Sequence, residues 1–172
     1  MLDRAPVDVH VLLQAAARRF ESAARDRDVS VTIAAASDLP RISVDAARMH
    51  QVIGNLVANA LAHAPRGSAV ALSASRPANG HGVMLSVTDA GPGIEPSRLP
   101  TVFEAFAQGK RPTGSVGLGL TIVREFVRAH GGTVDVTSEP GCTCFDITLP
   151  AAAVQQADRR GRRLLNPDAR FA

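Results

Sequence analysis

Two asparagines four residues apart form the first constellation in this sequence that could do chemistry. Asn55 and Asn59 lie within the segment QVIGNLVANALAHAP, and residues at i and i+4 share one face of a helix. A neutral amide oxygen can complete the oxygen shell of Mg²⁺, which takes few protein ligands and keeps phosphate and water oxygens. The alternative is that the two amides cap or bridge neighbouring loops, and the pair alone does not decide between these interpretations.

Two glycine-containing segments downstream could shape a pocket for a ligand. Residues 89–94 (DAGPGI) begin with an Asp at the end of an expected strand, where its carboxylate could accept a hydrogen bond from a ligand amino group. The glycines there would let the backbone approach a flat ring closely. Residues 114–120 (GSVGLGL) open an expected helix, whose free N–H groups suit a phosphate. An ordinary Asp-Gly turn explains the first segment, and a flexible hinge the second, equally well.

A long connection rich in Gly and Pro joins these two segments, and such connections are generally functional or mobile. Within it, Phe103 and Phe106 stand three residues apart on one short turn. The pair could pin a mobile lid to the body of the protein, although ordinary core packing explains it equally well.

The elements that must position these residues can be predicted from hydrophobic periodicity and turn signals. We expect helices over residues 8–27, 45–64 and 118–130, the first two capped by Asp8 and Asp45, and the second ended by Ala64-Pro65. We expect strands over residues 29–36, 69–75, 83–87, 133–138 and 144–149, with a short apolar stretch before Asp45. Helices mixed with mostly antiparallel strands, without regular βαβ alternation, predict an α+β fold. This is a two-layer α/β sandwich in which about three helices cover one mixed sheet.

Composition limits the classes of protein that this chain can represent. Its 172 residues are 45% hydrophobic and 20% charged, which predicts one globular domain over residues 1–150, followed by a flexible Arg-rich tail over residues 151–172. The tail, with Arg159, Arg160, Arg162, Arg163 and Arg170 against two Asp, accounts for the whole net charge of +3. With a balanced body, no Trp and no Tyr, the chain lacks the basic stripe and stacking aromatics of a nucleic-acid-binding protein.

The sequence also favours a cytoplasmic setting. It contains no stretch of about 18 apolar residues, so we expect no membrane span. The first residues lack the charged-then-apolar pattern of a signal peptide. Two cysteines are too few to staple a secreted scaffold, and we expect Cys142 and Cys144 to be small residues of the core.

Taken in order, the Asn pair, residues 89–94, the Phe pair and residues 114–120 resemble the N, G1, F and G2 boxes of a known family. This is the ATP-binding domain of bacterial sensor histidine kinases, related to gyrase and MutL. The resemblance extends to PVDVHVLLQAAARRF near the start and to GCTCFDITLP near the end, and so covers nearly all of residues 1–150. It implies the Bergerat ATP-binding fold, with ATP and Mg²⁺ as ligands.

The resemblance also implies roles for individual residues. Asn59 would be the Mg²⁺ ligand, and Asn55 would line the phosphates. Asp89 would accept a hydrogen bond from the adenine amino group, with Thr143 near the same end of the pocket. Residues 107–116 would form the ATP lid. The other positions placed around the nucleotide are His63, Gly91, Gly93, Ile94, Phe106, Gly117, Leu118, Gly119 and Leu120.

Asn55 bears on the reaction type as well. In the ATP-hydrolysing branches of the family this position resembles a Glu that acts as general base, and an amide cannot take a proton at neutral pH. Transfer to a protein nucleophile is therefore favoured over hydrolysis. Kinases of this type usually carry a basic residue where Ala62 stands, and commonly one at Gln108, to stabilise the transferring phosphoryl group. Lys110, the only Lys in the chain, could substitute as a catalytic residue, together with Arg111, or could be merely solvated.

The phosphoacceptor is expected on another domain or chain. Kinases of this family phosphorylate a His followed by an acidic residue on a dimerising helical hairpin. None of the five histidines, His10, His50, His63, His81 and His130, has that setting. We expect the domain to act with a separate dimerisation domain, upstream of a response regulator, and favour a natural stand-alone subunit over an excised domain. Two alternatives remain: a degenerate ATP-binding interaction module, consistent with Ala62 and Gln108, and an anti-sigma-factor-like serine kinase on the same fold.

Overall fold

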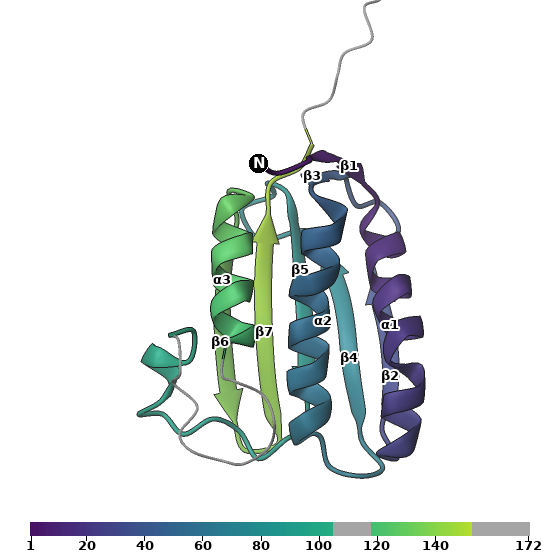
Figure 1. The fold of residues 1–172 in the computed structure, drawn as a ribbon, viewed down its shortest axis with the longest axis vertical. Coiled ribbons are helices and arrows are strands. Elements are labelled where there is room, and N and C mark those ends of the chain that lie inside the picture. The colour runs from purple at the N-terminus through teal and green to yellow at the C-terminus, as the bar shows by residue number, and fades with distance from the viewer. Residues whose placement is uncertain (105–117, 153–172) are drawn as a thin grey trace, which may run out of the picture.

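The structure is a computed structural model that describes residues 1–104 and 118–152. In this part of the chain three α-helices lie side by side over one face of a five-stranded sheet, which confirms the predicted two-layer sandwich (Figure 1). The helices are α1 (Val9–Asp26), α2 (Ala46–His63) and α3 (Gly119–Ala129). The strands, in their order across the sheet, are β2 (Ser30–Ala35), β4 (Ala69–Ser75), β5 (Val83–Asp89), β7 (Cys142–Leu149) and β6 (Thr133–Glu139). None of the described helices is long and apolar enough to cross a membrane.

The sheet is mixed, with only β2 and β4 running parallel and every other pair antiparallel. Alternation along the strands sends one set of side chains toward the helices. On β7 this set includes Phe145, Ile147 and Leu149, all fully buried, and it packs with the apolar residues of α2 and α3 to form the core. The intervening side chains, such as that of Asp146, lie on the other face of the sheet, which is more polar.

The helix ends follow from local chemistry, as predicted. The Asp8 carboxylate accepts a hydrogen bond from the N–H of His10 at 2.9 Å, and the Asp45 carboxylate accepts one from the N–H of Arg48 at 3.1 Å. α2 ends at His63 because Ala64, which precedes a proline, adopts an extended conformation with ψ of 130°.

The start of α2 and the end of α3 are held together by a buried histidine to which the sequence analysis assigned no role. His130 follows α3 and is fully buried. Its Nδ1–H donates to the carbonyl of Phe126 at 2.6 Å, and its Nε2 accepts from the N–H of Asp45 at 3.0 Å. The two bonds require the neutral imidazole with its proton on Nδ1. They join the start of α2 to the end of α3.

Four expectations need correction. The strand β1 (Ala5–Val7), paired antiparallel with β3 (Ile42–Val44), was missed because three residues containing a proline show no period. β5 extends to Asp89, and β7 begins at Cys142, so both strands are longer than predicted. The cysteines are not core residues: Cys142 is exposed and Cys144 half-buried, because the register of β7 turns their neighbours Thr143 and Phe145 toward the helices instead.

A short 3-10 turn (Leu99–Thr101) lies in the connection after β5. At the other end of the chain, the N–H of Ala152 donates to the carbonyl of Arg41 at 2.7 Å, and Ala151 bridges Ile42. Residues 153–172, which hold the arginines of the predicted tail, lie outside the described residues, so the boundary at residue 150 stays a prediction.

Candidate functional site

One end of the sandwich collects most of the predicted site residues that the structure describes. β5 ends there at Asp89, α2 ends at His63 and β7 begins at Cys142, whereas α3 begins further up, at Gly119, beside the middle of α2 (Figure 1). The antiparallel pairing of β5 and β7 sets Asp89 directly opposite Thr143. Asp89, His63 and Thr143 therefore meet at one edge because β5, α2 and β7 each start or stop there.

Asp89 is the only acidic residue buried among the described residues, with 4% of its surface exposed. Its Oδ1 accepts a hydrogen bond from the N–H of Gly91 at 2.8 Å. Burial raises the pKa of the Asp89 carboxyl, and the Gly91 hydrogen bond and nearby His63 offset part of that rise. Within the described part of the chain Oδ2 makes no hydrogen bond, so the carboxylate retains an acceptor for a ligand donor.

The glycines after Asp89 are needed by the protein itself. A Cβ added to Gly91 would lie 2.6 Å from Asp89 Oδ1 and 3.0 Å from the carbonyl oxygen of His63. Gly93 has φ of +86°, and a Cβ there would lie 2.9 Å from the backbone of Glu139. These close approaches, together with the hydrogen bond from the Gly141 N–H to the Gly91 carbonyl at 2.9 Å, press the loop against the β6–β7 turn.

Two hydroxyls tie this loop to the sheet. Thr143 is buried, with 4% exposure, and its Oγ1 lies 2.7 Å from Ser138 Oγ. Ser138 Oγ also accepts the N–H of Ile94 at 2.8 Å. Sequence reasoning named Thr143 and Ile94 but missed Ser138. The sequence signal that could have identified Ser138 is the alternation along β6, in which Ser138 takes the next helix-facing position after Val134 and Val136.

The Asn pair lies on α2 beside the start of α3. Asn55 and Asn59 are both half-buried, and Asn55 Nδ2 donates to the carbonyl of Gly119 at 3.1 Å. Among the described residues no group of three or more His, Cys, Asp or Glu could hold a metal ion. The available donors are neutral amide oxygens, which fit a Mg²⁺ ion whose other ligands come from phosphates and water.

Several predicted residues lie outside the described part of the chain: Phe106, Lys110, Gly117, Gln108, Arg111 and the predicted lid over residues 107–116. Leu118 and Leu120, beside that gap, are exposed and buried respectively. Ala62 is exposed on α2. Phe103 is half-buried and packs edge-on against Phe145 with ring centroids 6.0 Å apart, which favours the core-packing interpretation for this member of the Phe pair.

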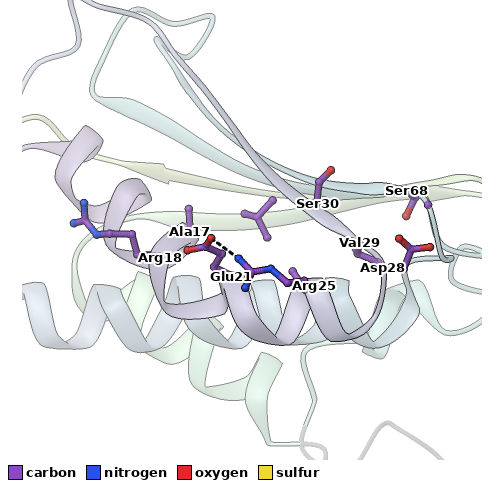
Figure 2. A pocket seen from close by; sticks show the side chains of 11 residues that line it. Ala17, Arg18, Glu21, Arg25, Asp28, Val29, Ser30 and Ser68 are labelled. Atoms are coloured by element: carbon purple, nitrogen blue, oxygen red, sulfur yellow. Dashed lines mark hydrogen bonds and ion pairs between the residues drawn. The ribbon is translucent and has the colours of Figure 1, made fainter.

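A separate hollow of about 610 Å³ lies between α1 and the edge strand β2 (Figure 2), and β4 separates β2 from β5, the strand that carries Asp89. Charged side chains of both signs line it, and Glu21 and Arg25, one turn apart on α1, pair at 2.8 Å along its helical wall. None of the predicted site residues lines this hollow. All of its charged side chains are exposed, in contrast to Asp89, so this hollow does not mark a second candidate site.

Comparison with known proteins identifies the family of this chain. The family model described as "Histidine kinase-, DNA gyrase B-, and HSP90-like ATPase" matches residues 44–153. The sensor-like histidine kinase SenX3 of Mycobacterium tuberculosis is 38% identical over 170 residues, which cover 95% of this chain and 41% of SenX3. The probable sensor histidine kinase TcrY of the same species is 42% identical over 157 residues, which cover 87% of this chain and 31% of TcrY. The chain thus spans less than half the length of these relatives.

Solved structures give the same result. The mycobacterial sensor histidine kinase MprB is 29% identical, with a TM-score of 0.72 over 86% of this chain and 97% of the MprB chain. Full-length ShkA in complex with AMPPNP is 36% identical, with a TM-score of 0.74 over 88% of this chain and 33% of the ShkA chain. The catalytic domain of the histidine kinase ThkA, at 23% identity, shares the fold with a TM-score of 0.78. The chain belongs to the family of histidine kinase-, DNA gyrase B-, and HSP90-like ATPases.

Proposed function

We propose that this chain binds ATP with Mg²⁺ and transfers the γ-phosphoryl group to a histidine of a phosphoacceptor protein or domain in two-component signalling. The observation that carries the proposal is that α2 links two polar features: its last residue lies beside the loop that follows buried Asp89, and its middle carries the Asn55–Gly119 contact. Asp89 would then bind the purine base, and the start of α3 beside Asn55 would bind the phosphates of the same ligand.

The adenine end of the proposed site is supported by Asp89. One of its oxygens is held by Gly91, which fixes the carboxylate and leaves the second oxygen for the adenine amino group. The Ser138–Thr143 hydroxyl pair stands at the same level of the sheet and would complete the polar wall. His63, exposed at the end of α2, would flank the ring.

The phosphate end is supported by the start of α3. Leu118, the residue before the helix, provides no side-chain cap, so within residues 1–104 and 118–152 no side chain caps the first N–H groups of α3, which suit an anionic ligand. Asn59 would contribute its amide oxygen to Mg²⁺, with phosphates and water filling the other positions. The ion would neutralise charge on the phosphates and on the transferring group.

Phosphoryl transfer, rather than hydrolysis, is supported by the chemistry of Asn55. An amide at this position cannot take a proton from an attacking water at neutral pH. In the proposed reaction the bond from the γ-phosphorus to the oxygen of ADP breaks as a bond to an imidazole nitrogen forms. Positioning of the two reactants and neutralisation of charge would supply the rate enhancement.

Sensor kinases with 38% and 42% identity support a histidine as acceptor, and the proposed partners are a dimerisation domain and, through it, a response regulator. These partners belong to the proposal because the chain aligns with under half of each relative. Lys110 is proposed to supply a cation to the γ-phosphate in place of the basic residues absent at Ala62 and Gln108.

The test is to incubate the protein with γ-labelled ATP and candidate dimerisation domains, with Asp89→Asn as the site variant. Label on the partner that is stable in base and labile in acid, and reduced by Asp89→Asn, supports transfer to histidine. Acid-stable label on a serine would identify the alternative serine kinase. ATP binding with no labelled partner would leave the degenerate module as the better account.

A further inference from the structure

The hydrogen bond between Asn55 and Gly119 has only one chemically consistent orientation. A carbonyl oxygen can only accept, so the side-chain nitrogen of Asn55 must face Gly119, and its Oδ1 must point the other way. A Cβ added to Gly119 would lie 3.8 Å from Asn55 Cγ, an ordinary contact distance. A small side chain at residue 119 would therefore fit against Asn55 without displacing it.

Besides the burial of Leu120, the first turn of α3 has few other attachments within the described residues. Its N-cap residue, Leu118, makes no side-chain capping bond, and the segment that precedes it is rich in glycine. Within the described residues, two side-chain hydrogen bonds hold this turn: Asn55 to Gly119, and Thr121 Oγ1 to the carbonyl of Phe103 at 3.1 Å. Only the first of these joins the turn to α2, the helix that carries the Asn pair.

The opposite end of α3 is anchored separately. His130 bonds both to Phe126 and to the N–H of Asp45, and Arg4 donates to the carbonyl of Ala129. α3 is thus joined to α2 at both of its ends by hydrogen bonds between a side chain and the backbone, from His130 at one end and from Asn55 at the other. Loss of the amide bond would release the end that faces the proposed phosphates and leave the far end in place.

We propose that Asn55 is a positioning residue, whose amide N–H holds the start of α3 against α2 so that the first N–H groups of α3 stay directed at the phosphates. The inference rests on the proposed function for its ligand and deepens the role of Asn55 within that site. It also explains why this position carries an amide. An ionised Asp or Glu has no hydrogen to donate, and would place an anionic acceptor against the acceptor oxygen of Gly119.

The test compares Asn55→Asp with Asn59→Asp, the same chemical change one helical turn away. Hydrogen exchange of the amides at the start of α3 is measured by NMR without nucleotide. Losing one hydrogen bond is expected to speed exchange there about five-fold or more in Asn55→Asp. Asn59 makes no hydrogen bond to α3 among the described residues, so Asn59→Asp should leave this exchange unchanged. The slowest amides of β5 and β7 report whether each variant is folded.

A second readout is ADP affinity measured with Mg²⁺ and with EDTA. Asn55→Asp is expected to weaken ADP binding in both conditions, because the phosphate-facing turn is displaced whether or not the metal is present. Unchanged exchange at the start of α3 in Asn55→Asp would overturn the inference. Faster exchange with unaltered ADP affinity would also overturn it, because the bond would then serve the fold alone. If the wild-type protein bound no nucleotide, the proposed function would fail. Faster exchange in Asn55→Asp would still show, in that case, that the Asn55–Gly119 bond holds the start of α3.

Discussion

Asp89 and Thr143 lie directly opposite each other on β5 and β7, and each is only 4% exposed. Buried polar side chains need hydrogen-bond partners. Thr143 has Ser138, and Asp89 has the N–H of Gly91 for one of its two oxygens. The pair therefore forms a polar corner at the end of an otherwise apolar strand face, and this corner is where the proposed site reads the base.

The burial of Asp89 predicts a dependence of stability on pH. Because burial raises the pKa of this carboxyl, the folded protein holds its proton to higher pH than the unfolded chain does. Between the ordinary Asp pKa of about 3.9 and the raised folded value, the contribution of Asp89 to the free energy of unfolding falls as pH rises, and it stays low above that window. Asp89→Asn removes this contribution. In urea denaturation, the free energy of unfolding of Asp89→Asn relative to that of the wild type should increase from pH 3.5 to pH 7. A decrease of this difference over that range would contradict the assignment.

Gly91→Ala should disturb both the fold and the proposed site. The new Cβ would meet Asp89 Oδ1 at 2.6 Å and the His63 backbone at 3.0 Å, and backbone cannot move aside at little cost. We expect a loss of about 2 kcal/mol in the free energy of unfolding. Gly119→Ala is the matched control for stability, because its Cβ has 3.8 Å to the nearest atom and alanine favours a helix. Equal stability of Gly91→Ala and wild type in chemical denaturation would show that the loop is less tightly packed than described.

His130→Leu should destabilise the protein by about 2–3 kcal/mol, because it leaves the Asp45 N–H and the Phe126 carbonyl without their side-chain partner. His130→Gln, which offers both an acceptor and a donor, should recover part of the loss. The exposed His81 provides the control, since His81→Leu should change the free energy of unfolding by under about 0.5 kcal/mol. The prediction fails if the two leucine variants unfold at the same denaturant concentration.

Asn59→Ala tests the proposed metal ligand. The variant removes one amide oxygen from the proposed Mg²⁺ shell, so it should bind ATP about ten-fold more weakly when Mg²⁺ is present. In EDTA the affinities of variant and wild type should agree, because no metal joins the side chain to the nucleotide. Titration calorimetry in the two buffers gives the comparison, and an equal loss in both would assign Asn59 a contact with the nucleotide itself.

Much of the fold could be predicted because it depends on local chemistry. The bounds of β4 follow from its alternation, and the starts of α1 and α2 follow from the capping residues Asp8 and Asp45. The structure confirms all three predictions. What escaped prediction depends on pairing between distant segments. β1 exists only because β3 lies beside it, and the cysteines face away from the core because the register with β5 turns Phe145 inward.

The candidate site divides in the same way. Residue type and spacing pointed to Asn55, Asp89 and Thr143. The structure places Asp89 and Thr143 together at one end of the sandwich and Asn55 at the middle of α2, and their roles remain predictions. The bond from Asn55 to Gly119 joins residues 64 apart in the chain, and no local pattern announces it. Ser138 and His130 were missed for the same reason, since their partners become neighbours only in the folded protein.

The central claim is that Asp89 reads the base of a nucleotide bound at this end of the sandwich. Its most direct test is a calorimetric titration of ATP·Mg²⁺ into the wild type, Asp89→Asn and Asp135→Asn, the last an exposed Asp on β6. Loss of a hydrogen bond to a charged group predicts affinity about 10- to 100-fold weaker for Asp89→Asn, with Asp135→Asn equal to wild type. ATP affinity that is the same in all three proteins, or absent from the wild type, would contradict the account.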